Sequence, residues 1–350
     1  MPQTADAKSP QRIDALASAW TRRGIALLSR AKPQSLAVAL ESFDRAIALR
    51  QRLDIEADVG FRYGFTASWL NRADALSRLA EPERLLEAVH AYDIALTELD
   101  KLPRGQDPRF ELRHGIAWMN RGFTLAAMTR PVRQDEALSS FQNAVTVLRG
   151  SPFANTPEHR RALAASLVNI VRIQPVDDSR TDILLHEALL AVSDLEISDI
   201  PAAEIALQAR IALCRSLARE SIDQETDVTI SDLVDDGLAQ VRHWQDQGIT
   251  LSRKLVADLF AFGATFYRIH QPQFLGEFLR ENMNVMSPPP RPLAVAICNI
   301  ARHALQLAVG NLVSSGVAAF SSTTEEVIDD LRDLRRTEKQ LEEFHRAAAS

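Results

Sequence analysis

The sequence predicts an all-α fold, an α-α superhelix of antiparallel helical hairpins that ends in C-terminal capping helices. The first observation behind this prediction is a repeat, because three of the four tryptophans lie 49 residues apart. A fixed period of about 20–50 residues is the signature of a repeat architecture. The second observation is the composition of the 350 residues, in which glycine, proline and aromatic residues are sparse, as is typical of helical chains.

Each repeat predicts one helical hairpin. A small residue follows each tryptophan by four positions and a leucine by seven, so the three share one helical face on which a second helix packs closely. A proline thirteen positions after the tryptophan breaks the chain between the two helices, and an aromatic residue 23 positions after it lies on the second helix. The predicted core of the repeats consists of Trp20, Trp69 and Trp118, of Gly24, Ala73 and Gly122, and of Phe43, Tyr92 and Phe141.

One hairpin cannot bury both of its apolar faces, so neighbouring hairpins must stack. The expected order is a disordered tail over residues 1–10, three long repeats over 11–150, degenerate hairpins over 151–286, a proline-rich linker over 287–292 and C-terminal helices over 293–350. Among the degenerate hairpins, the first is expected at 157–197, followed by helical pairs at 201–246 and 251–284. The last helix follows a capping box at Thr323 and Glu326 and is expected to cap the solenoid, although contact with another subunit is the alternative.

The repeats resemble tetratricopeptide repeats (TPR). The resemblance rests on Trp118-Met-Asn-Arg-Gly-Phe-Thr-Leu125 followed by Ala137-Leu-Ser-Ser-Phe-Gln-Asn-Ala144, and on the matching segments of the other two repeats. The units are longer than the family's length of about 34 residues. Most of the added residues precede the tryptophan, so we expect them to extend the first helix to about 20–24 residues.

The resemblance to TPR proteins implies a ligand on the concave surface lined by the first helices. In that family the variable positions lie one, two, five and nine residues after the tryptophan. The candidate partner-binding residues are Arg22, Asn71, Asn120, Asp74, Arg78 and Phe123. Asparagine amides suit hydrogen bonds to an extended peptide backbone, and Arg22 and Arg78 suit a carboxylate. The arginines three positions after each tryptophan are expected to bridge adjacent hairpins instead.

The sequence offers no motif for catalysis. A glycine-rich phosphate loop, a nucleophile elbow, a paired-histidine helix and a CxxC motif are all missing from it. We therefore predict no catalytic residue, no metal and no cofactor, with an enzyme site in residues 200–350 as the alternative. The acidic residues between Asp223 and Asp236 are expected to form a solvated helix start rather than a cation site. The aromatic residues between Phe260 and Phe274 are expected to pack in a core.

The function predicted is that of a non-enzymatic scaffold for a protein or peptide partner. Residues 1–150 carry a net charge of +3 and the remainder −9, with no basic tract, so a nucleic-acid partner is not expected. An apolar leader and a run of about 18 apolar residues are missing, so we expect a cytoplasmic protein without membrane contact. The segment Ala46-Ile-Ala-Leu-Arg-Gln-Arg-Leu53 resembles kinesin-light-chain repeats, which implies as an alternative an adaptor on a tubulin-like filament. The oligomeric state is left open.

Overall fold

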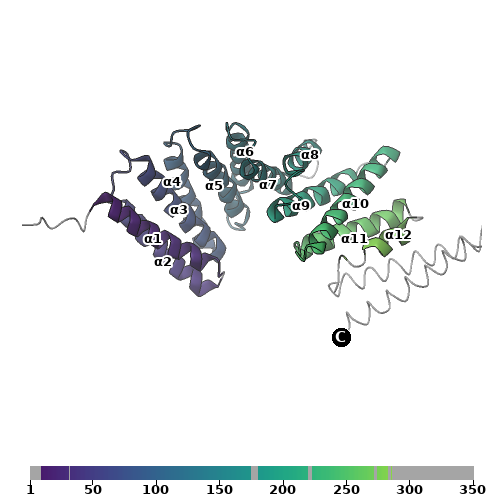
Figure 1. The fold of residues 1–350 in the computed structure, drawn as a ribbon, viewed down its shortest axis with the longest axis horizontal. Helices are drawn as coiled ribbons and strands as arrows, with labels where there is room; N and C mark the ends of the chain where they lie inside the picture. The colour runs from purple at the N-terminus through teal and green to yellow at the C-terminus, as the bar shows by residue number, and fades with distance from the viewer. Residues whose placement is uncertain are drawn as a thin grey trace, which may run out of the picture. The chain divides into compact units, whose positions relative to one another are not determined.

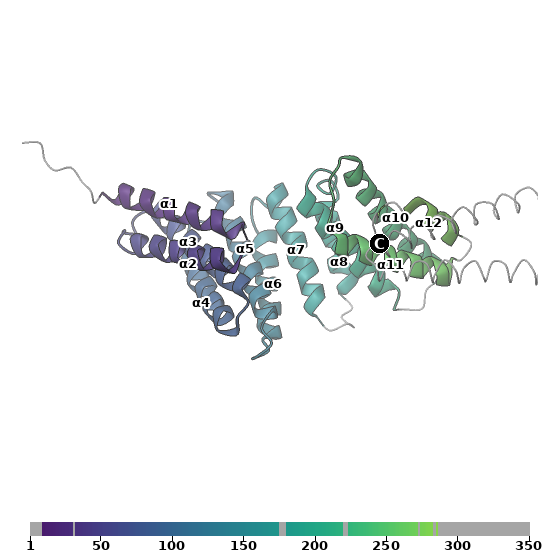
Figure 2. The same cartoon turned by 90° about the horizontal axis from the view of Figure 1, so that it is seen from below.

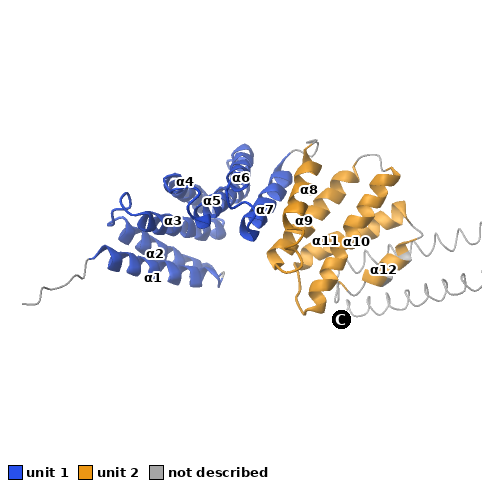
Figure 3. Ribbon diagram, turned by 45° about the horizontal axis from the view of Figure 1, so that its top comes forward, with its two compact units in different colours: residues 1–179 blue, residues 180–350 orange. Residues whose placement is uncertain are grey.

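The computed structural model describes residues 9–30, 32–174, 180–219, 223–271, 274–282 and 285. These residues form twelve α-helices and no strand, so the predicted all-α fold class is confirmed for them. The chain divides into two compact units, Met1–Ser179 and Arg180–Ser350 (Figure 3). The tail over residues 1–8, the proline-rich linker and the C-terminal cap lie outside the described residues.

Unit 1 contains three consecutive helical hairpins and one further helix (Figure 1). Each second helix also packs on the first helix of the next hairpin, and neighbouring first helices touch, so the hairpins stack as a solenoid within this unit (Figure 2). The hairpins are α1 (Pro10–Leu28) with α2 (Pro33–Arg50), α3 (Val59–Leu79) with α4 (Pro82–Leu99), and α5 (Pro108–Ala126) with α6 (Gln134–Arg149), and α7 (Pro157–Ile173) follows them.

Capping residues set where the first helices begin. Ser9, Asp58 and Asp107 are the N-caps of α1, α3 and α5, and each side chain accepts a hydrogen bond from a backbone amide of the first turn. The three helices contain 19, 21 and 19 residues, so only α3 reaches the predicted length. The three helices begin at equivalent positions, and the difference in length arises at the C-terminal end, where α3 continues two residues further in the repeat, to Leu79.

The break between the two helices of a hairpin follows the prediction in two repeats and departs from it in the third. Pro33 and Pro82 are the first residues of α2 and α4, where the missing amide hydrogen costs nothing. Pro131 instead lies in a turn closed by a bridge between Thr129 and Val132, and α6 begins only at Gln134. The third connection is therefore longer than the proline position alone indicated.

Small residues let the two helices of a hairpin approach. A Cβ atom added to Gly24 would lie 2.4 Å from a ring carbon of Phe43, and one added to Gly122 would lie 2.8 Å from Phe141. In the second repeat Ala73 and Tyr92 pack in one buried cluster. All six of these residues are buried, whereas Trp20, Trp69 and Trp118 are only partly buried.

Arginines cover the three partly buried tryptophans. Arg23, Arg72 and Arg121 each lie three positions after their tryptophan, and each guanidinium carbon lies 5.2–5.7 Å from the centre of the indole ring. This is cation–π geometry, and the aliphatic stem of arginine shields apolar surface while its charge stays in water. The indoles therefore lie under arginines at the margin of the core.

The expected hairpin over residues 157–197 is divided between the two compact units. Its two helices, α7 and α8 (Thr181–Val192), belong to different compact units, and α8 packs on α9 (Ile200–Leu217) instead. Leu167, at the position of the missing fourth tryptophan, is fully buried in α7. Helix α7 is thus the last helix of unit 1.

Unit 2 continues with α10 (Gln224–Asp246), α11 (Arg253–His270) and α12 (Leu275–Asn282). Helices α9, α10 and α11 pack on one another around a single apolar cluster that includes Trp244. Phe260, Phe266 and Tyr267 belong to this cluster, as expected, whereas Phe274 is half exposed. Within the described part of the chain, no helix is both long and apolar enough to cross a membrane.

Candidate functional site

A groove lies between α3 and α5 in unit 1. Its volume is about 520 Å³. Helix α3 contributes apolar and polar side chains, and α5 adds two arginines. The lining residues are Tyr63, Leu70, Asn71, Asp74 and Arg78 of α3 and Arg109, Leu112, Arg113, Ile116, Ala117 and Asn120 of α5.

Four of the six residues predicted to bind a partner line this groove. Asn71, Asp74 and Arg78 occupy positions two, five and nine after Trp69, and Asn120 occupies position two after Trp118. These positions lie on the side of a first helix that faces away from the second helix of its own hairpin. Two adjacent first helices therefore bring them to one surface.

The other two predicted residues lie elsewhere. Arg22 is an exposed residue of α1 and does not line the groove. Phe123 is 37% exposed and lies edge-on to Phe141, with 5.4 Å between ring centres. The guanidinium of Arg172 in α7 covers its ring at 5.0 Å. Phe123 thus belongs to the contact of α5 with α6 and α7.

Some polar side chains of the groove already form an ion pair or a hydrogen bond within α3. Asp74 pairs with Arg78 at 3.0 Å, so this arginine is less available to a carboxylate than the sequence implied. The Asn71 side-chain nitrogen donates to the carbonyl oxygen of Ala67 at 2.8 Å, a bond within its own helix. That bond fixes the amide plane and leaves the amide oxygen as an acceptor for a ligand's backbone N–H.

Arg113 is the groove residue that sequence reasoning missed. Its guanidinium carbon lies 4.6 Å above the centre of the Tyr63 ring, and no carboxylate among the described residues pairs with it. Arg109 also lies over Tyr63, at 5.6 Å, but its guanidinium is paired with Asp107. The repeat pattern gives no signal for Arg113, because Ala15 and Gly64 occupy the same column.

The arginines three positions after the tryptophans do not belong to the groove. Arg72 donates to Asp44 at 2.7 Å and Arg121 donates to Asp93 at 2.7 Å, in each case across the junction with the preceding hairpin. This confirms for Arg72 and Arg121 the expectation that they bridge adjacent repeats, whereas Arg23 donates to Ser42 within its own hairpin. The positive charge of Arg72 and Arg121 is already neutralised by a partner in the fold.

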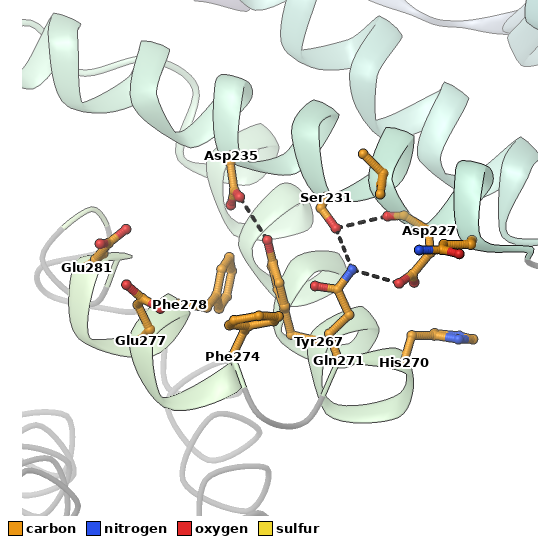
Figure 4. Close-up of a pocket in the computed structure, with 12 residues that line it drawn as sticks. Asp227, Ser231, Asp235, Tyr267, His270, Gln271, Phe274, Glu277, Phe278 and Glu281 are labelled. Atoms are coloured by element: carbon orange, nitrogen blue, oxygen red, sulfur yellow. Dashed lines mark hydrogen bonds between the residues drawn. The ribbon is translucent and has the colours of Figure 1, made fainter. Parts of the chain in front are cut away.

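A second hollow, of about 540 Å³, lies in unit 2 between α10, the end of α11, and α12 (Figure 4). The Tyr267 hydroxyl donates to Asp235 at 2.8 Å, and the Gln271 side chain donates to Asp227 at 2.7 Å. Partial desolvation of the carboxylate raises the pKa of Asp235, and the hydrogen bond from Tyr267 offsets part of that effect. This hollow lies in the region to which the alternative of an enzyme was assigned.

The acidic residues of this region act chiefly in the fold. Asp223 is the N-cap of α10 and accepts a hydrogen bond from the backbone amide of Thr226 at 2.8 Å. Across the described residues, no group of three or more histidine, cysteine or acidic side chains is placed to hold a metal ion. The hollow therefore presents carboxylates beside aromatic rings, and two of these carboxylates, Asp227 and Asp235, accept hydrogen bonds within the unit.

Comparison with known proteins adds no family to this geometry. No protein-family model matches the chain, and no curated protein sequence matches it.

Proposed function

We propose that the chain is a TPR-like, non-enzymatic scaffold that binds an extended peptide segment of a protein partner in the groove between α3 and α5. The observation that supports this most directly is the meeting of Asn71 and Asn120, one repeat apart, in a single groove. Two amides at equivalent positions of adjacent helices offer repeated hydrogen bonds to a peptide backbone. The apolar contribution comes from Leu70, Leu112 and Ile116.

The charge of the groove favours acidic peptides. Three arginines line it against one aspartate, and Arg113 retains an unneutralised guanidinium held over Tyr63. A guanidinium that is already oriented by a ring loses little conformational entropy when it binds a carboxylate. A peptide that places an acidic side chain beside Arg113 is therefore the preferred ligand.

The experiment begins with a random peptide library displayed on phage and selected on the intact protein. The enriched peptides are then synthesised and their affinities measured by isothermal titration calorimetry. We expect acidic sequences whose binding is lost in the Asn71→Ala, Asn120→Ala double variant and retained in Gln142→Ala, an exposed amide on α6 outside the groove. If no peptide is enriched, or if enriched peptides bind the double variant equally well, the proposal is wrong.

The filament adaptor stays an alternative to the peptide scaffold, and the cytoplasmic location stays a prediction. Co-sedimentation with a tubulin-like polymer separates the adaptor from the peptide scaffold, since the groove variants would then leave co-sedimentation unchanged.

A further inference from the structure

The first helix of each hairpin has one face that is turned toward the preceding hairpin. In α3 this face carries Phe65, Ser68 and Ala75, and all three are buried. In α5 the same repeat positions carry His114, Ala117 and Thr124, which are buried as well. Arg72 and Arg121 lie on this face too, and each pairs with an aspartate of the preceding second helix.

Helix α1 carries the same face without a cover. The equivalent residues are Leu16, Ala19, Arg23 and Ala26, which we call the α1 edge face, and all four are exposed. Leu16 is 51% exposed, compared with 8% for Phe65 and 4% for His114. Arg23 contacts Trp20 and the Ser42 hydroxyl, but no carboxylate pairs with it among the described residues.

The junction between α4 and α5 shows one kind of element that covers such a face. Helix α4 covers the face on α5 with Asp93, which receives the hydrogen bond from Arg121, and with Leu96 and Leu99. The two leucines follow the aspartate at intervals of three residues and pack against Ala117. Spacing of this kind places all three side chains along one side of a helix.

We propose that the α1 edge face binds an amphipathic helix of a partner protein that carries the pattern Asp-x-x-Leu-x-x-Leu. Its aspartate pairs with Arg23, as Asp93 pairs with Arg121, and its two leucines cover Leu16 and Ala19. The charge match supports this occupant, because Arg23 is the one arginine of its repeat column without a carboxylate partner in the described residues. This surface is separate from the groove and does not depend on the proposed function.

The test uses a synthetic, end-capped peptide of residues 82–103, which carries Asp93, Leu96 and Leu99. Fluorescence anisotropy measures its binding to the full chain. We expect saturable binding that weakens by at least about tenfold in Arg23→Glu and in Leu16→Lys, since each change places a like or buried charge in the contact. Arg30→Glu, at an exposed arginine in the turn after α1 and outside the edge face, is the matched control and should bind as the parent does.

A charge-reversal pair distinguishes a specific contact from general attraction. A peptide with Asp93→Arg should bind the parent protein poorly and the Arg23→Glu protein better. Circular dichroism of each variant checks that α1 is still folded, which we expect because the substituted side chains are exposed.

Four outcomes would overturn the proposal. One is no saturable binding up to about 1 mM peptide. Another is equal binding by the parent, Arg23→Glu and Leu16→Lys proteins. A third is a dimer in sedimentation that Leu16→Lys converts to a monomer, which would make a second copy the occupant. The last is peptide binding that appears only after removal of residues 1–8, which would make the chain's own segment the occupant.

Discussion

Arg50 of α2 donates a hydrogen bond to the Ser68 hydroxyl of α3, at 2.7 Å, across the junction of the first two hairpins. The same guanidinium donates to Asp14, Ser18 and Thr21 of α1, so it joins three helices while being 3% exposed. A buried guanidinium is stable only when its donors are satisfied in this way. Gly64 provides the space, since a Cβ atom there would lie 2.7 Å from the Arg50 Nε.

Replacement of Arg50 by methionine should lower the free energy of unfolding of unit 1 by about 2–4 kcal/mol. The loss arises because Asp14 and the hydroxyls of Ser18 and Ser68 lose a shared donor while methionine restores only the volume. Urea unfolding followed by circular dichroism measures it. Arg52→Met, an exposed arginine in the following turn, is the control and should change stability by less than about 0.5 kcal/mol. Equal midpoints for the two variants would contradict the role given to Arg50.

Substitution of Gly24 by alanine should destabilise the first hairpin by about 1–3 kcal/mol. Alanine favours the helix by about 1 kcal/mol, but its methyl group would collide with the Phe43 ring, and the collision should outweigh that gain. A double-mutant cycle with Phe43→Leu tests the cause, because the smaller side chain should relieve the collision. If the two changes are simply additive, steric conflict with Phe43 is not the reason for the glycine.

The ion pair between Arg121 and Asp93 should contribute a coupling energy of about 0.5–1.5 kcal/mol. Arg121 is mostly shielded by Trp118 and Asp93 is half exposed, so solvent screening keeps the value modest. The measurement is a double-mutant cycle of Arg121→Ala and Asp93→Ala by thermal unfolding. The pair of Arg84 and Glu87, exposed on α4, serves as the reference and should show the smaller coupling. The reverse order would argue against a structural role at the junction.

Stability should fall as the pH drops below about 6.5, because burial lowers the pKa of His114 and of His159. In the window between the lowered native pKa and the ordinary value, the unfolded chain binds a proton that the native chain does not, so stability rises with pH there. The geometry agrees, since the Trp118 indole donates to His114 Nε2 at 3.1 Å and needs that nitrogen unprotonated.

His114→Phe should flatten this pH dependence and cost little at pH 7.5, because phenylalanine already occupies the same column in the second repeat, at Phe65. Urea midpoints between about pH 5 and 7.5 measure the effect. His90→Phe, at an exposed position of α4, should leave the profile unchanged. An unaltered slope in His114→Phe would assign the pH dependence to other groups.

The repeat pattern was sufficient to predict the fold class and the identity of the first helices. Tryptophan, small residue and leucine at offsets of zero, four and seven specify a packed helical face by their shapes alone. The end of that regularity was harder to predict. Helix α7 has the buried Leu167 at the tryptophan position, yet it is the last helix of unit 1, and the helix that follows belongs to unit 2. A helix that begins a hairpin and a helix that ends a unit have the same periodicity in the sequence, and only tertiary contacts distinguish the two.

Only part of the groove could be predicted from the sequence, because some of its residues depend on tertiary contacts. Asn71, Asp74, Arg78 and Asn120 follow from their position in the repeat, since position fixes the side of the helix. Arg113 lies in a column that holds alanine and glycine elsewhere, and its role comes from the ring of Tyr63 one helix away. Contacts between residues fifty positions apart leave no local trace in a sequence.

The ion pairs at the α2–α3 and α4–α5 junctions are equivalent, and this affects whether a whole repeat can be deleted from the chain. Arg72 and Arg121 hold the same place in successive units, as do their partners Asp44 and Asp93. Excision of residues 59–107, one full period, would join α2 to α5 and set Arg121 opposite Asp44. The ion pair would form again at the splice, but Arg113 would take the place of Gly64 beside the buried Arg50, so a unit of this length can be lost only where that position also becomes small.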